Sequence, residues 1–481
     1  MSGENANGGG EKTDKRRYNY MENVLQHIIQ KISVNEAERK RNNQILNSAI
    51  EIMLAKMRDT SPLFGKLYTR IFYGGSYYDN LKTGKPDEYD IDLLMMLSKK
   101  QMFTLKPIET APGFVTLQMA DKNDSTEFAE LFDGEFLCTD KVLKWMESLV
   151  SKTLSNLPTS GSQNILRIQD TDFFIKITKS GPAFTIRLNG QLGDTHMNFD
   201  VDLVPCFIFN AAMWPKGKFR TNPVQDKTDF FIVPKQPRGK LDCKMNHCWR
   251  LSFQEQERQL IRSCRVLKPC VKLMKKLRDH MNHKAISSYF IKTMFIWQIE
   301  NAGKTFFDNS LSYVFVEMLQ VYEKHLAERK IQYYWNTDNN LIGSLSDIML
   351  DNYCNQVRRI VKDIVTKEEN NPYYVGKFFL NKEEMEQLKV DVPLPVRPTG
   401  KEVKENGGNA NGGASSDKSN GSNASNTKCS CSAANNFESA LADIRREVAE
   451  ARRDQEALKM DIMDLLQVVV KRLDNIQAKL A

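Results

Sequence analysis

Residues 74–92 read GGSYYDNLKTGKPDEYDID, and this stretch decides the fold class. Gly74 and Gly75 form a turn before Ser76, and Glu88-Tyr89-Asp90 follows in a run of strand-forming residues. Because alternate residues of a strand share a face, Glu88 and Asp90 present two carboxylates side by side. Carboxylates bind Mg²⁺, and backbone N–H groups at a glycine turn that enters a helix bind phosphate. The stretch therefore predicts a metal-dependent nucleotide site in a mixed α and β protein.

A third carboxylate is expected from the later strand NFDVDL, residues 198–203. Asp200 and Asp202 share one face of this strand, and we predict Asp202 as the third ligand, with Asp200 as the alternative. Together with Glu88 and Asp90, Asp202 would hold two Mg²⁺ or Mn²⁺ ions that bridge nucleotide phosphates. Nucleotidyl transfer is the chemistry that this set predicts.

The rest of the 481 residues divides by composition. Residues 1–19 are rich in Gly, Asn and charge and are predicted to be disordered. Residues 20–58 predict a spine helix, restarted at the capping box Ser33-Val34-Asn35-Glu36. Short β-rich runs such as DFFIKITKSGPAFTIRL, a predicted hairpin, fill residues 59–215, and helical patterns fill residues 216–398. The predicted class is α+β: a bilobal protein with a mixed sheet core, a long N-terminal helix and a helical C-terminal lobe.

The C-terminal part is predicted to be a linker followed by one helix. Residues 399–437 are dominated by Gly, Asn, Ser and charge, which is typical of a flexible linker. Residues 438–481 carry apolar residues at heptad spacing, with a shift of register before Leu473. Self-association as a coiled coil and docking of an amphipathic helix on the protein's own core remain alternatives.

Composition excludes several classes. The nine cysteines have no repeated spacing, so no disulfide framework is expected. No apolar run reaches the ~20 residues of a membrane helix, and the amino terminus lacks a signal-like apolar run. We therefore expect a cytoplasmic protein without a transmembrane segment.

Five blocks in order carry a resemblance to a known family: GGSYYDNLKTGKPDEYDID, VDLVPCF, WRLSFQEQE, CVKLMKKL and SSYFIKT. They resemble cyclic GMP-AMP synthase and its animal relatives, the cyclic GMP-AMP synthase-like receptors of the Mab family within the nucleotidyltransferase superfamily. The resemblance implies a bilobal nucleotidyltransferase with Glu88, Asp90 and Asp202 as its metal triad. Asp92 also fits an acid-apolar-acid pattern, but the spacing from Ser76 selects Glu88 and Asp90.

The resemblance also implies nucleotide contacts. An arginine would contact guanine, a tyrosine would stack on a base, and a glutamate, two serines and two lysines would bind the rest of the nucleotide. The residues at these positions are Ser76, Arg250, Glu257, Lys275, Ser288, Tyr289 and Lys292. Each has a structural alternative, since Tyr289 can fill an apolar gap and the neighbouring Trp249 and Phe253 can belong to the core.

One feature of cyclic GMP-AMP synthase is missing. Its zinc thumb of one histidine and three cysteines lies between the WRLSF block and the CVKLMKKL-like block, whereas here the interval holds no such set. Cys243, His247 and Cys248 lie before WRLSF and are a weaker zinc candidate, so no structural zinc is expected. Relatives without the thumb include sensors of double-stranded RNA, which favours RNA over double-stranded DNA as the ligand.

Basic residues supply a candidate surface for that ligand. Residues 256–285 contain nine Lys or Arg against two acids, at helical spacing, and a basic triplet lies on the spine helix. The predicted nucleic-acid contacts are Arg39, Lys40, Arg41, Lys268, Lys272 and Lys276. The alternative for the triplet is an ordinary solvated face.

The expected function is an innate immune sensor that makes a cyclic dinucleotide of the cyclic GMP-AMP type from ATP and GTP, activated by double-stranded nucleic acid. Its product would act on a STING-type receptor. Two alternatives stay open: an oligoadenylate synthase-like enzyme with a linear product, and a non-catalytic Mab-type nucleic-acid or protein binding protein that acts in development.

Overall fold

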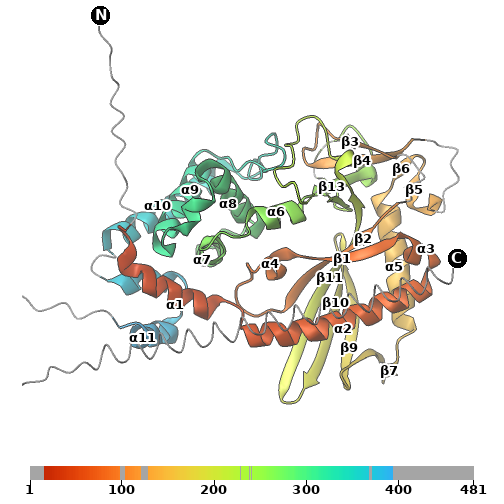
Figure 1. The fold of residues 1–481 in the computed structure, drawn as a ribbon, viewed down its shortest axis with the longest axis horizontal. Helices are drawn as coiled ribbons and strands as arrows, with labels where there is room; N and C mark the ends of the chain where they lie inside the picture. Colours follow the sequence, from red (N-terminus) through yellow and green to blue (C-terminus); the bar gives the residue numbers. More distant parts are fainter. Residues whose placement is uncertain are drawn as a thin grey trace, which may run out of the picture. The chain divides into compact units, whose positions relative to one another are not determined.

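A computed structural model describes residues 16–393, except 98–102, 121–127, 228, 238, 240 and 368–370. A mixed β-sheet with its covering helices forms one part, and a bundle of helices forms the other (Figure 1). The predicted α+β class with a helical second lobe is therefore confirmed.

The centre of the sheet is built by the strands that carry the predicted acids. β2 (Glu88–Met95) lies between β1 (Tyr68–Gly74), to which it is antiparallel, and β11 (Thr195–Phe209), to which it is parallel. The predicted hairpin is confirmed as β9 (Thr171–Ser180) and β10 (Ala183–Leu192), joined at Gly181, whose φ of 57° suits a glycine turn. The other strands are β3 (Phe103–Pro107), β4 (Phe114–Met119), β5 (Phe132–Asp133), β6 (Phe136–Leu137), β7 (Thr159–Ser160), β8 (Gln163–Ile168), β12 (Phe230–Val233) and β13 (Cys248–Ser252).

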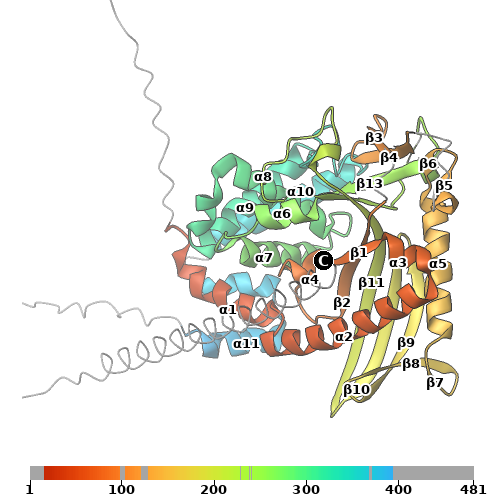
Figure 2. The ribbon, with the colours of Figure 1, turned by 45° about the vertical axis from the view of Figure 1, so that its right-hand side comes forward.

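The N-terminal helix is broken in two. α1 (Glu22–Ile32) packs against the helical lobe, whereas α2 (Glu36–Thr60) runs along the sheet and contacts α5 (Thr139–Ser155) (Figure 2). The cap of α2 is Asn35 rather than the predicted Ser33, because the Asn35 side chain accepts hydrogen bonds from the N–H groups of Ala37 and Glu38. The spine thus spans both lobes with its break at residues 33–35.

The helical lobe begins later than predicted. The boundary at residue 215 is wrong, since β12 and β13 extend the sheet beyond it. These strands are only four and five residues long and are separated by a loop with three Lys and two Pro, so their sequences are too short to show a strand period. The helices of the lobe are α6 (Gln254–Leu260), α7 (Leu267–His280), α8 (Ser288–Ala302), α9 (Leu311–Ala327), α10 (Asp347–Lys367) and α11 (Lys382–Asp391). Short α3 (Pro62–Leu67) and α4 (Gly75–Tyr78) flank β1, and 3-10 turns occur at Asn19–Met21, Ala129–Leu131, Ala211–Met213, Met245–His247, Lys304–Asp308 and Pro372–Phe378.

The ends of the chain lie largely outside the described residues. Tyr18 is described and is 4% exposed within the core, so the prediction of disorder is wrong for residues 16–19. Its ring buries enough apolar surface to order this short stretch. The predicted linker and C-terminal helix, residues 399–481, are not among the described residues. In the described part of the chain, no helix is long and apolar enough to cross a membrane.

Candidate active site

The glycine turn lies directly on one of the predicted metal ligands. Gly75 begins α4 with a φ of 70°, and a Cβ atom there would lie 1.7 Å from Oδ2 of Asp90. Only glycine fits both the backbone angle and the space. The turn and the Asp90 carboxylate are thus held against each other, as the sequence predicted.

The parallel pairing of β2 with β11 brings the acids of both strands together. Asp202 lies opposite Asp90, and Asp200 lies opposite Glu88. The Asp202 carboxylate accepts a hydrogen bond of 2.5 Å from the Thr185 hydroxyl, whereas Asp200 forms an ion pair of 3.3 Å with Arg187. Asp200 is therefore paired with a cation, and Asp202 as the third metal ligand stays a prediction.

Electrostatics at this acidic face suit a divalent cation. Desolvation raises the pKa of Asp90, and the neighbouring carboxylates of Asp202 and Glu88 raise it further. Asp90 as a residue is exposed at the surface, but its carboxylate lies against Gly75, which explains the desolvation. A bound Mg²⁺ or Mn²⁺ ion would relieve the repulsion between these carboxylates, and both ions prefer oxygen ligands. The donor set therefore fits such an ion.

Glu88 is paired with a lysine in this conformation. Its carboxylate forms an ion pair of 2.8 Å with Nζ of Lys82, and Lys82 also lies 3.3 Å from the Asp87 carboxylate. Burial alone would lower the pKa of Lys82, but these two contacts outweigh it and raise the pKa. Across the described residues, no group of three or more Asp, Glu, His or Cys side chains is arranged to hold a metal ion.

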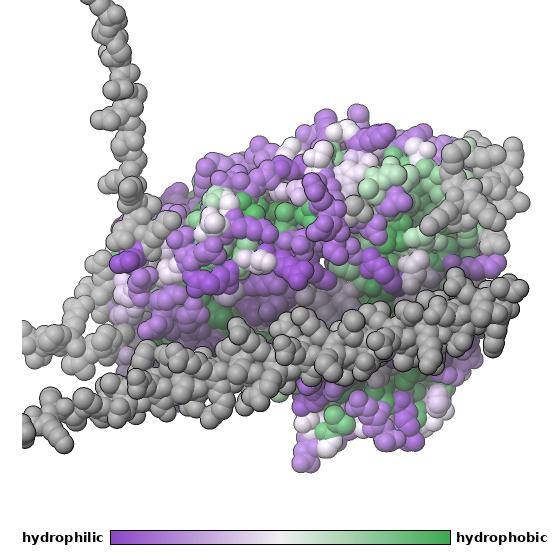
Figure 3. All heavy atoms as spheres, viewed as in Figure 1, coloured by the Kyte–Doolittle hydropathy of each residue, from purple (hydrophilic) through white to green (hydrophobic). Residues whose placement is uncertain are grey.

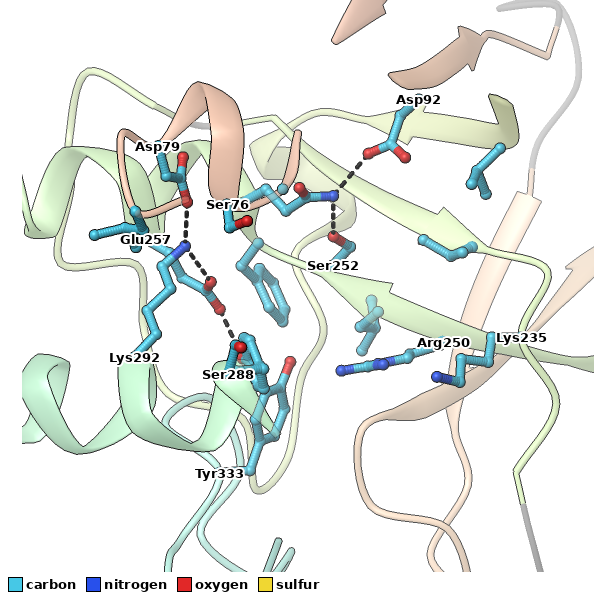
Figure 4. Close-up of a pocket in the computed structure, with 18 of the residues that line it drawn as sticks. Ser76, Asp79, Asp92, Lys235, Arg250, Ser252, Glu257, Ser288, Lys292 and Tyr333 are labelled. Carbon is cyan, nitrogen blue, oxygen red and sulfur yellow. Dashed lines mark hydrogen bonds and ion pairs between the residues drawn. The ribbon is translucent and has the colours of Figure 1, made fainter. Parts of the chain in front are cut away.

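A cavity of about 290 Å³ lies next to the acidic face, between the sheet and the helical lobe. Arg250, Lys235 and Ser252 enter it from the sheet side, and Lys292 and Ser288 enter it from α8 (Figure 4). All seven residues predicted to bind nucleotide line this one cavity: Ser76, Arg250, Glu257, Lys275, Ser288, Tyr289 and Lys292. The structure therefore brings together side chains that are up to 216 positions apart in the sequence.

A buried charge cluster forms one wall of the cavity. The Lys292 ammonium lies 2.8 Å from the Asp79 carboxylate and 3.2 Å from that of Glu257, as Figure 4 shows. Arg258 donates a further hydrogen bond of 2.8 Å to Asp79. Burial alone would raise the pKa of Asp79, but Lys292 and Arg258 outweigh it and hold the pKa below its ordinary value. Asp79 was not predicted as a residue of the site, although it lies between Ser76 and Glu88 in the stretch that was predicted to form it.

Glu257 is 3% exposed, and both of its carboxylate oxygens are engaged by the protein. The Tyr289 hydroxyl and the Trp335 indole N–H donate to one oxygen at 2.7 and 3.1 Å. Predicted as a nucleotide contact, Glu257 here holds the ring of Tyr289 and the ammonium of Lys292 in place. The Arg250 guanidinium lies 5.7 Å from the centre of the Tyr289 ring, at the end of the cavity where Tyr333 also lies.

Two more predicted residues have groups available to an anion. Lys275 is 6% exposed and donates to the carbonyl of Leu81 at 2.7 Å, and burial, with help from nearby Arg278, lowers its pKa to about 8. Ser288 accepts a hydrogen bond of 3.0 Å from Arg278, which leaves the Ser288 hydroxyl proton free to be donated.

Asp92, the third acid of the strand, plays a different part. It is 6% exposed and accepts a hydrogen bond of 2.7 Å from the Gln254 amide, which also donates to Ser252. Burial raises the pKa of Asp92 to about 7. Asp92 is thus engaged by Gln254, and the choice of Asp90 over Asp92 as a metal ligand stays a prediction. Trp249 and Phe253 are buried core residues.

Comparisons with known proteins agree with this geometry. Residues 77–263 match the family described as Mab-21 protein nucleotidyltransferase domain, and residues 266–359 match the Mab-21 protein HhH/H2TH-like domain. A cyclic GMP-AMP synthase-like receptor of Tribolium castaneum is 42% identical over 378 residues, 76% of this chain and 93% of that protein. One of Aethina tumida is 40% identical over 390 residues, with 77% and 94% covered. The chain belongs to the cyclic GMP-AMP synthase-like receptor family.

In this family member, three of the residues predicted to contact nucleic acid, Arg39, Lys268 and Lys272, lie close together. Arg39 and Lys272 both donate to the side-chain oxygen of Asn80, and Lys268 lies one helical turn before Lys272 on α7. Burial lowers the pKa of Lys272 to about 8, and the charges of Arg39 and Lys268 lower it further. Lys272 is only 6% exposed, whereas Lys40 is fully at the surface and Arg41 and Lys276 are partly exposed. Figure 3 shows strongly hydrophilic side chains over the helices on one face of the molecule.

The weaker zinc candidate of this chain, Cys243, His247 and Cys248, forms contacts within the protein. The thiols of Cys243 and Cys248 are 3.2 Å apart, and Nε2 of His247 lies 2.8 Å from the Asp133 carboxylate. The His247 ring stacks on Phe136. The absence of structural zinc stays a prediction.

Proposed function

We propose that this family member is a nucleic-acid-activated nucleotidyltransferase that makes a cyclic dinucleotide of the cyclic GMP-AMP type from ATP and GTP. The observation that carries the proposal is the single cavity lined by all seven expected nucleotide residues and by Gly75, which lies against the carboxylate of Asp90, the strand partner of Asp202. The names of the relatives point to the same class of enzyme.

Different side chains of the cavity would bind the triphosphate and the base of a nucleotide. Ser76, Lys275 and Ser288 would bind the triphosphate of the donor, since each offers a hydroxyl or ammonium proton. Arg250 and Tyr289 would hold a base through hydrogen bonds and stacking. Glu88, Asp90 and Asp202 would hold Mg²⁺ or Mn²⁺, which when bound would stabilise the attacking and leaving oxygens of an in-line displacement.

Double-stranded RNA is the proposed activating ligand, and double-stranded DNA is the alternative. Binding would release Glu88 from Lys82, because a carboxylate paired with an ammonium group is not available to a cation. The product would act on a STING-type receptor, and the cytoplasm is the proposed location.

The decisive experiment incubates the purified chain with all four nucleoside triphosphates and Mg²⁺ or Mn²⁺, with double-stranded RNA, double-stranded DNA or neither. Products are read by mass spectrometry, and 3′-5′ exonuclease digestion separates linear from cyclic species. We expect a cyclic dinucleotide with RNA only. A product with DNA only would keep the enzyme and overturn the choice of ligand, and a linear product would support the oligoadenylate synthase-like alternative.

The non-catalytic alternative has one observation in its favour, the ion pair that engages the Glu88 carboxylate with Lys82. The double variant Glu88→Ala, Asp90→Ala separates the two cases. In an enzyme it abolishes synthesis and leaves nucleic-acid binding intact, whereas a chain without nucleotide turnover under any condition would be a binding protein.

A further inference from the structure

Two thiols face each other in the loop that leads into β13, outside the nucleotide cavity. The sulfur atoms of Cys243 and Cys248 are 3.2 Å apart, and the Cys248 sulfur also lies 3.4 Å from the carbonyl oxygen of Lys244. Neither cysteine is among the residues that line the nucleotide cavity. A disulfide bond is about 2 Å long, so the two sulfur atoms need to approach by only about 1 Å to form one.

The two thiols differ in their access to solvent. Cys243 is half-buried and lines a surface cavity of about 600 Å³, whereas Cys248 is 0% exposed. Burial raises the pKa of the Cys248 thiol, which keeps it protonated at neutral pH. A small oxidant therefore reaches Cys243 first, with Cys248 in place behind it. The other cysteines that the structure describes are all buried: Cys138, Cys206, Cys264, Cys270 and Cys354.

The loop that carries the pair is anchored on both sides. The Thr110 hydroxyl donates to the Asp242 carboxylate at 2.9 Å. The carboxylate of Asp133 is contacted by the ammonium of Lys244 at 3.1 Å and by Nε2 of His247 at 2.8 Å. These contacts fix the backbone before each cysteine, so the two sulfur atoms are held opposite each other.

We propose that Cys243 and Cys248 are a modification site that a peroxide converts to a reversible disulfide. The Cys243 thiolate attacks one oxygen of hydrogen peroxide, the O–O bond breaks, and Cys243 becomes a sulfenic acid. The other oxygen leaves as hydroxide and takes a proton from solvent, in exchange for the proton that Cys243 released. The Cys248 sulfur then attacks the Cys243 sulfur, the S–O bond breaks, and the hydroxyl leaves with the Cys248 proton as water. Two thiols are oxidised and one peroxide is reduced to two water molecules.

The new bond fixes the start of β13, because Cys248 is the first residue of that strand. β13 pairs with β4 from Cys248, opposite Thr116, to Arg250, opposite Phe114. Arg250 in turn lines the nucleotide cavity. A disulfide restricts the unfolded chain, so the oxidised protein is more stable than the reduced one. The site goes beyond the proposed function, since its chemistry needs neither nucleotide nor nucleic acid.

The sequence allows the bond to be mapped directly. Trypsin cleaves after Lys240, Lys244 and Arg250, which separates LDCK, residues 241–244, from MNHCWR, residues 245–250, unless a disulfide joins them. The reduced full-length chain is treated with hydrogen peroxide, its remaining thiols are blocked with iodoacetamide, and its peptides are read by mass spectrometry. We expect the two peptides to be joined, and dithiothreitol to separate them again.

Three variants test the roles of the two thiols. Cys248→Ser should leave a sulfenic acid at Cys243 that dimedone traps, whereas Cys243→Ser should leave the buried Cys248 as a thiol. Cys264→Ala, which removes another buried cysteine, is the matched control and should join the two peptides as the wild type does. Oxidation should raise the melting temperature of the wild type by about 5 °C and should not raise that of Cys243→Ser.

The map of the wild type does not depend on any variant that fails to fold. Oxidation of Cys243 to a sulfenic or sulfinic acid without joined peptides would show a single reactive thiol and overturn the proposal. Two unreactive thiols, with or without zinc found by elemental analysis of the purified chain, would overturn it as well. Joined peptides without a rise in melting temperature would overturn the effect on β13. Each outcome is independent of whether the chain makes a nucleotide product.

Discussion

Asp202 on β11 lies opposite Asp90 on the parallel strand β2, and this pairing joins two acids that are 112 positions apart in the sequence. The Thr185 hydroxyl orients Asp202, whereas Asp200 is neutralised by Arg187. The face that would hold a cation is therefore built by strand register.

Asp202→Asn should lower metal-dependent nucleotide turnover by about 100-fold or more, because it removes a negative ligand opposite Asp90. Asp200→Asn removes an equal charge two residues away and should lower turnover only a few fold. Pyrophosphate release at saturating Mg²⁺ measures both, with the melting temperature as a check on folding. A larger loss in Asp200→Asn would exchange the roles of the two acids.

Gly75→Ala should destabilise the fold and abolish turnover. A left-handed backbone costs an alanine about 1–2 kcal/mol, and the new Cβ would also collide with the Asp90 carboxylate. Gly84→Ala is the matched control, since Gly84 has a φ of 77° but open space around its Cα. Urea unfolding should show the backbone cost in both variants and the additional loss in Gly75→Ala alone. Equal losses of stability and turnover would show that the contact with Asp90 is unimportant.

Lys292→Met should destabilise the protein by about 3–5 kcal/mol, because it leaves Asp79 and Glu257 buried without their shared cation. Lys324→Met, which breaks an exposed pair with Glu328, should cost less than about 1 kcal/mol. Chemical denaturation compares the two variants without any nucleotide. Similar free energies of unfolding would mean that water reaches the Asp79 cluster.

Lys275→Met should stabilise the protein while it weakens triphosphate binding. Burial lowers the Lys275 pKa to about 8 in the folded state, against an ordinary 10.5 in the unfolded chain. Between these values the unfolded chain binds more protons, so this lysine makes the free energy of unfolding rise with pH across that window. Below pH 8 its full cost remains, and Lys275→Met removes it.

The measurement compares wild type with Lys275→Met in urea, once below pH 8 and once between pH 8 and 10.5. The stability advantage of the variant should shrink at the higher pH. Lys275→Arg, which stays charged, should be less stable than the wild type at the higher pH. An advantage that is independent of pH would show that Lys275 titrates normally in the folded protein.

Local sequence determined much of this protein. The strand period placed Glu88 and Asp90 on one face of β2 and Tyr89 behind it, because alternation along a strand depends only on backbone geometry. The glycine turn and the β9–β10 hairpin were predictable from short motifs, whose chemistry lies within a few neighbouring positions. The residues that line the cavity were instead implied by the resemblance of five sequence blocks to a known family. Caps and boundaries were harder: Asn35 competed with Ser33, and the short strands β12 and β13 carried too few residues to show a period.

Only the tertiary structure decided which charges meet. No local pattern indicated that Asp79 would bind Lys292 and Arg258. Nor did one indicate that the Glu257 carboxylate would accept hydrogen bonds from Tyr289 and Trp335, or that Lys82 would pair with Glu88. These partners come from different lobes or from a loop whose path depends on both spine helices. The physical reason is that a side chain's type and face follow from its neighbours in sequence, whereas its ion-pair partner and its pKa depend on burial and distance after the lobes have packed.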